Sequence, residues 1–140
     1  MAEPTEPDTI LTDQVDQARL ARGAAVLAGI DGEAGQAVVD SLGSFAPRLA
    51  NHIVAHAFGD VYAGTDLTPA QRQLVTIGAL TALGGCEPQL AVHIGAGLNV
   101  GLTRAEIIEA ITHAAVYAGF PRAINAANIA QQVFQARSAT

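Results

Sequence analysis

The sequence has no lysine, no tryptophan and a single cysteine, and its seven basic residues are all arginine, against 13 acidic residues. Its formal net charge at pH 7 is −6. A protein that binds a nucleic-acid backbone neutralises phosphates with clustered basic side chains, and scattered arginines form no such cluster. We therefore expect no nucleic-acid partner. The lack of lysine beside frequent alanine and glycine is typical of a bacterial genome rich in G and C.

Long apolar runs are also missing. No uninterrupted apolar stretch approaches the roughly 20 residues that cross a bilayer, so we expect no membrane contact. Residues 1–9 are acidic and have no apolar centre, unlike a signal peptide. The single cysteine, Cys86, cannot form an internal disulfide, so nothing indicates a secreted, disulfide-stabilised fold. These absences predict a cytoplasmic protein.

Hydrophobic residues are abundant instead. They make up 50% of the 140 residues, while charged residues make up only 14%, below the usual quarter. This length predicts a single domain over residues 11–140, preceded by a mobile, polar arm over residues 1–10. Because a domain this small has a limited interior, we expect part of its apolar surface to face another subunit. The alternative is an alanine-rich chain whose small apolar side chains face water.

The fold class predicted from these patterns is all-α, because alternating runs of strand type are absent. Capping boxes begin two of the helices, at Thr68 and Thr103, and glycines end several others. The helix over 47–62 is apolar on most sides, which predicts a buried helix. In the last helix we expect Ile124, Ala127, Ile129 and Val133 to face inward. The expected helices span residues 12–30, 33–42, 47–62, 69–83, 87–100, 104–118 and 121–136.

Cys86, Gln89 and His93 occupy neighbouring positions on one face of the helix over 87–100. Cys86 lies about two turns, or ~10 Å, from His93, so the two cannot form a direct thiolate–imidazole pair. Gln89, four residues before His93, can reach its ring. A histidine on an apolar face suits acid–base chemistry when it has a partner. The alternative is a core histidine that bonds a backbone carbonyl.

His52 and His56 are four residues apart and share one face of the helix over 47–62. Burying two imidazoles is costly unless they are hydrogen-bonded. Three interpretations remain open: they line a substrate pocket with His93, they are structural, or they bind a metal with His93. A metal site lacks an obvious carboxylate or third ligand nearby, so we expect no metal. A further stripe, of Glu106, Glu109, His113 and Tyr117, is interpreted as a solvated or interface face.

Four segments, over residues 57–68, 72–85, 90–101 and 116–126, together resemble the carboxymuconolactone decarboxylase family within the AhpD-like superfamily. The resemblance covers roughly residues 22–133. It implies an AhpD-like bundle of about six to seven helices, assembled as a homotrimer or homohexamer with pockets near the subunit contacts. It also places His93 in the pocket.

The sequence differs at two positions from the redox proteins of the AhpD-like superfamily. Those proteins carry a second cysteine where Gln89 stands, and a glutamate near the position of Gln73. A dithiol cycle needs a resolving thiol, so the missing cysteine argues against a dithiol peroxidase. His52 and His56 stand where members usually carry aromatic or apolar residues, and Ala55 stands where they carry a glutamate.

The resemblance implies a lyase that decarboxylates a small oxygenated carboxylic acid or carboxylated lactone without a cofactor. His93 would donate a proton, and His52 or His56 would stabilise the developing oxyanion. We expect Cys86, Gln89 and Asn99 to contact the substrate, although Asn99 could instead cap its helix. Three alternatives stay open: a dehydratase, cyclase or isomerase of a biosynthetic pathway, a non-catalytic small-molecule-binding protein, and a peroxidase that uses Cys86 alone.

Overall fold

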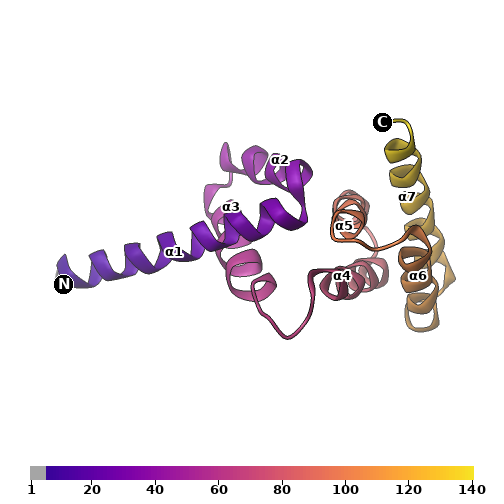
Figure 1. Ribbon diagram of the computed structural model, residues 1–140, viewed down its shortest axis with the longest axis horizontal. Coiled ribbons are helices and arrows are strands. Elements are labelled where there is room, and N and C mark those ends of the chain that lie inside the picture. The colour runs from indigo at the N-terminus through magenta and orange to yellow at the C-terminus, as the bar shows by residue number, and fades with distance from the viewer. Residues whose placement is uncertain (1–5) are drawn as a thin grey trace. The chain divides into compact units, whose positions relative to one another are not determined.

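The computed structural model describes the backbone of residues 6–140 and the side chains of residues 16–140. These residues form seven α-helices and one π-helical segment, which confirms the all-α prediction (Figure 1). None of the described helices is long and apolar enough to span a membrane. The elements are α1 (Glu6–Ile30), α2 (Gly32–Gly43), α3 (Pro47–His52), η1 (Ile53–Tyr62), α4 (Pro69–Leu83), α5 (Glu87–Asn99), α6 (Arg104–Ala118) and α7 (Phe120–Ser138).

The chain forms two compact units. The first comprises Met1–Gly29 and Glu33–Thr65, and the second comprises Ile30–Gly32 and Asp66–Thr140. The single domain expected over residues 11–140 therefore stays a prediction. Helix α1 begins at Glu6 rather than at residue 12, so the second half of the expected arm is helical, while residues 1–5 lie outside the described residues.

In the first unit, two glycines let α1 and η1 approach at backbone distance. A Cβ atom at Gly59 would lie 2.6 Å from the carbonyl oxygen of Arg19, and one at Gly23 would overlap the carbonyl of Val54. Any larger residue at either position would push the helices apart. The continuous helix expected over 47–62 is present, but it changes into a π-helix at Ile53, a rare form that often occurs near functional sites.

The expectation that the helix over 47–62 is buried on most sides is wrong. Val54, Ala55 and Phe58 are buried against the rest of the unit, whereas His52 and His56 are exposed. The reason is that only the face that carries Gly59 packs against α1, so only the side chains of that face are buried. The opposite faces remain open to water.

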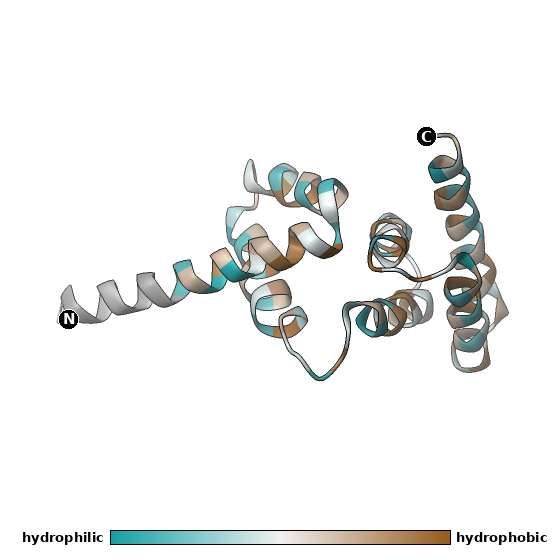
Figure 2. Ribbon diagram, in the orientation of Figure 1, coloured by the Kyte–Doolittle hydropathy of each residue, from teal (hydrophilic) through white to brown (hydrophobic). Residues whose placement is uncertain are grey.

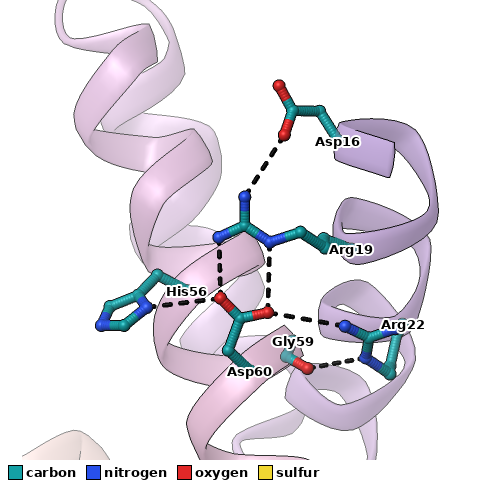
Figure 3. Close-up of polar contacts among 6 residues, drawn as sticks. All are labelled: Asp16, Arg19, Arg22, His56, Gly59 and Asp60. Atoms are coloured by element: carbon teal, nitrogen blue, oxygen red, sulfur yellow. Dashed lines mark hydrogen bonds and ion pairs between the residues drawn. The ribbon is translucent and has the colours of Figure 1, made fainter. Parts of the chain in front are cut away.

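An ion-pair network connects the exposed side of the same two elements (Figure 3). Arg19 of α1 donates to both carboxylate oxygens of Asp60, at 3.1 and 2.7 Å, and Arg22 donates to the carbonyl of Gly59 at 2.6 Å. The hydrogen bond from Arg19 lowers the pKa of Asp60 to about 2. Asp60 therefore stays ionised across the physiological range and fixes the guanidinium of Arg19.

The second unit packs α4, α5, α6 and α7 around one apolar core. Both predicted capping boxes are present, with Thr68 paired to Gln71 and Thr103 paired to Glu106. Helices α6 and α7 run antiparallel (Figure 1). The start of α6 accordingly meets the end of α7, where the guanidinium of Arg104 donates to Ser138 at 2.7 Å. Figure 2 shows apolar stripes interrupting the hydrophilic residues along these helices. The buried core consists of Ile77, Leu90, Ile94, Leu102, Ile107, Ile111, Ala115, Ala123, Ala126 and Ala130.

The inward face of α7 differs in part from the expectation. Ala127, Ile129 and Val133 are half-buried as expected, but Ile124 is 59% exposed. The buried positions of α7 are Ala123, Ala126 and Ala130, which belong to the core. Alanine allows α7 to lie close to its neighbours, and a branched side chain on that line would hold it away.

Within the second unit, hydrogen bonds join Ile30 to α5 and α5 to α7. Asn99 donates to the carbonyl of Ile30 at 3.0 Å, and Arg137 donates to Asn99 and to the carbonyl of Gly95, each at 2.9 Å. The neighbouring Asp31 is only 5% exposed, and its Oδ1 atom has no partner among the described residues. Burial raises the pKa of Asp31 from 3.8 to about 6.

We predict opposite effects for two glycine substitutions in α1. Gly23→Ala should lower the free energy of unfolding by about 2 kcal/mol or more, because its Cβ overlaps a backbone carbonyl. Gly29→Ala meets no atom within 4 Å and should be neutral or stabilising by roughly 0.5–1 kcal/mol. Urea unfolding followed by circular dichroism measures both. Equal midpoints for the two variants would contradict the close approach.

We also predict that Asp31→Asn stabilises the protein at pH 7. A folded pKa raised from 3.8 to about 6 means that stability is highest below pH 4 and is lost as pH rises through 6. The loss is about 3 kcal/mol at neutral pH. Removing the charge should abolish this pH dependence, as measured by urea unfolding at pH 4 and pH 7. Asp66→Asn, at an exposed loop position, is the control and should leave the difference between the two pH values unchanged.

Candidate active site

His93 of α5 faces the buried side chain of Gln73 of α4. Its Nδ1 atom lies 3.1 Å from Oε1 of Gln73. The amide is fully buried at 0% exposure, and its Nε2 atom has no partner among the described residues. Burial lowers the pKa of His93 below its ordinary value of 6.5. The site therefore joins a neutral imidazole to an amide that cannot ionise.

The amide oxygen selects the tautomer of the ring. An oxygen at Nδ1 accepts a hydrogen bond, so it favours the form in which Nδ1 carries the proton. In the neutral ring, Nε2 is then the basic nitrogen, and in the charged ring Nε2 carries the exchangeable proton. The neutral amide thus orients the ring without raising its pKa as a carboxylate would.

The helices place this pair because of their local patterns. The capping box at Thr68 fixes the start of α4, and Gln73 then falls on the same buried face as Ile77, four residues later. The sequence placed Gln73 near the glutamate position of the redox members but predicted no contact with His93. The sequence alone gave no signal that the amide would be wholly buried.

The three residues expected to contact substrate are dispersed. The thiol of Cys86 donates to the carbonyl of Leu80 at 3.3 Å and lines a cavity of about 10 Å³, at most the size of one water molecule. Gln89 is exposed. Asn99 is exposed too, and its side chain bonds Ile30 and Arg137 rather than capping α5. Substrate contact by these three residues stays a prediction.

His52 and His56 belong to the first unit, and their environments differ. His56 lies beside Asp60, with its Nδ1 atom 3.4 Å from a carboxylate oxygen (Figure 3). His52 lines a separate pocket with Arg48 and Asn51, two residues that the sequence analysis did not single out. Because His93 lies in the other unit, the convergence of the three histidines stays a prediction.

An open groove of about 650 Å³ lies between α4 and α6. Its floor is apolar, and none of the predicted catalytic residues lines it. The predicted solvated or interface stripe forms its rim: Glu106, Glu109 and Tyr117 are exposed, and the ring centroid of His113 lies 5.8 Å from that of Tyr117. Across the described residues, no three His, Cys, Asp or Glu side chains gather in a way that could hold a metal ion.

The described helices define an all-α protein with a half-buried histidine paired to a buried amide. The chain matches the carboxymuconolactone decarboxylase family over residues 47–132, and it belongs to that family. This confirms the resemblance seen in the sequence. The matched range includes α3, η1 and the whole of α4, α5 and α6, so it contains both Gln73 and His93.

Two relatives carry decarboxylase names. The chain is 37% identical over 97 residues to the 4-carboxymuconolactone decarboxylase of Acinetobacter baylyi, which covers 69% of this chain and 72% of the relative. It is 36% identical over 80 residues to the nitrosuccinic acid decarboxylase of Metarhizium robertsii, covering 57% of this chain and 55% of that relative. An uncharacterised 15.0 kDa protein of Paracoccus denitrificans is 34% identical over 89 residues, covering 63% of this chain and 66% of the relative. The family and the two named relatives support an enzyme of the decarboxylase type.

Cys86→Ser should keep most of the activity. The serine hydroxyl can donate to the Leu80 carbonyl as the thiol does, and the adjoining cavity is too small for a substrate. Turnover by the variant should stay within about threefold of wild type, since only a single weak hydrogen bond changes. Steady-state kinetics measures this, with iodoacetamide-treated wild type as a second comparison. A loss of several orders of magnitude would show that the thiol takes part in the chemistry.

Proposed function

We propose that this protein is a cofactor-free decarboxylase of a small oxygenated carboxylic acid or carboxylated lactone, with His93 as the proton donor. The observation that carries the proposal is the pairing of His93 with the fully buried amide of Gln73. The two relatives with decarboxylase names support the reaction type.

The reaction divides into two steps. The bond between the carboxyl carbon and its neighbour breaks, carbon dioxide leaves, and the electron pair moves onto an adjacent oxygen as an enolate. The carbon then takes a proton from the Nε2 atom of charged His93, and solvent restores that proton. Because burial lowers the pKa of His93, its charged form is a stronger acid than an exposed imidazolium.

His52 and His56 are proposed to assist by stabilising the enolate oxygen. The exposure of both rings leaves them accessible to a ligand, although His56 also lies beside Asp60. Alanine variants at these positions should therefore lower kcat less than His93→Ala does, with the smaller cost at His56.

His93→Ala should lower kcat by ~100-fold or more, as expected for loss of a general acid. In wild type, kcat/KM should fall as pH rises through a pKa below 6.5, since only the charged ring donates. The expected substrate for the assay is a carboxylated lactone or a small 3-oxo acid, with carbon dioxide release as the readout. Full activity in the alanine variant would remove His93 from the mechanism and favour a non-catalytic binding role.

Gln73→Glu should shift that falling limb to higher pH. A carboxylate 3.1 Å from Nδ1 favours the imidazolium, so the pKa of His93 should rise by about one unit or more. NMR titration of the His93 ring protons measures the pKa directly, whether or not the variant remains active. Gln132→Glu, which adds the same charge at an exposed position on α7, should leave the titration unchanged.

The protein is also proposed to act as a homotrimer or homohexamer. Val75 lines the groove between α4 and α6 and is 65% exposed in the single chain. Two further large apolar side chains of the same unit, Val116 (76%) and Phe120 (75%), are exposed as well. An apolar surface of this kind is typical of an interface with another subunit.

Sedimentation at micromolar concentration should give three or six times the mass of 14.3 kDa. Val75→Glu should dissociate the assembly, because it buries a charge in the groove. Val38→Glu, in the first unit and 42% exposed, is the matched control and should leave the mass unchanged. A wild-type monomer would reject the proposal.

A further inference from the structure

A polar pocket lies wholly within the first unit, between α1 and the helix formed by α3 and η1. Its volume is about 290 Å³, at the lower end of the range of roughly 300–1,000 Å³ that small-molecule sites occupy. This volume suits a ligand much smaller than a nucleotide. The lining residues are Asp16, Arg19, Leu20, Arg48, Asn51, His52 and Ala55.

Helical spacing brings the donors to one wall. Arg48, Asn51 and His52 stand at positions i, i+3 and i+4, so they share the face of the helix that looks into the pocket. None of the three makes a hydrogen bond or ion pair with any described side chain. Their donors, a guanidinium, an amide and a ring N–H, are all available to a ligand, and a neutral imidazole still donates from one nitrogen.

The other wall carries a fixed cation and a competing anion. The carboxylate of Asp60 accepts two hydrogen bonds from the guanidinium of Arg19 (Figure 3). The remaining nitrogen, Nη1, lies 3.3 Å from Oδ1 of Asp16. Asp16 has a side chain that is 54% exposed, so this ion pair is weak and open to exchange. Among the described residues, no acidic side chain forms an ion pair with Arg48. Its positive charge is therefore available to a ligand.

We propose that this pocket binds a small carboxylate anion, with the guanidinium of Arg48 as its main ligand and Asn51 and His52 as additional donors. Guanidinium and carboxylate form paired, charge-assisted hydrogen bonds of matching geometry. The chain as a whole carries −6, so general electrostatics repel an anion, and binding must come from this local arrangement. His52 is the residue that this pocket shares with the proposed decarboxylation. The inference does not require that reaction, because binding is assigned mainly to Arg48, and every lining residue lies in the first unit, without His93.

The test is a binding titration of the full chain, with succinate and inorganic phosphate as separate probes at constant ionic strength. NMR shifts of the Arg48 and His52 side chains report the site, and calorimetry reports the affinity. We expect succinate to saturate both signals, with phosphate binding at least severalfold more weakly. Arg48→Gln should weaken succinate binding by about tenfold or more, as expected for loss of a charge-assisted pair. Preferential binding of phosphate would overturn the assignment to carboxylates.

Two variants and two controls complete the design. Asp16→Asn should tighten succinate binding severalfold, since it removes the competing carboxylate. Arg122→Gln, which removes the same charge from an exposed position on α7, should have no effect. His93→Ala should also leave binding unchanged, so failure of the proposed chemistry and failure of this site give different results. Unchanged affinity in Arg48→Gln, or equal losses in Arg48→Gln and Arg122→Gln, would reject the proposal.

Discussion

Close approach of helix backbones through glycine and alanine underlies both units of this protein. In the first unit, Gly23 and Gly59 allow α1 to contact the carbonyls of η1 directly. In the second, Ala123, Ala126 and Ala130 provide the buried face of α7. These small residues lie beside larger core side chains such as Ile77 and Ile94, which fill the rest of the second unit's interior.

The buried amide of Gln73 is the main chemical consequence of that packing in the second unit. An amide at 0% exposure is tolerated because its oxygen pairs with His93, while the nitrogen remains without a described partner. A glutamate at this position would carry charge into the core and hold the imidazole in its charged form. Glutamine instead leaves the pKa of the ring lowered by burial and orients the ring through Nδ1.

The first unit separates two histidines that look equivalent in the sequence. His56 turns toward Asp60 and joins an ion-pair network that already fixes Arg19, whereas His52 turns toward Arg48 and an open pocket. They are four residues apart, but the helix between them is a π-helix, so regular helical spacing does not describe their relation. One ring therefore has a structural neighbour, and the other has a place for a ligand.

The sequence by itself determined the helices and the family. Capping boxes at Thr68 and Thr103 act within four residues, so their effect is local and readable, and the segments that resemble the family were confirmed over residues 47–132. Only the tertiary structure decided which faces are buried. Ile124 is exposed while the neighbouring Ala123 is buried, and the helix over 47–62 is buried on one side instead of most sides, because burial depends on how closely a second helix approaches. For the same reason the Gln73–His93 contact and the raised pKa of Asp31 required the structure: both arise from the loss of water around a polar group, and that loss is a property of the packed helices rather than of residue order.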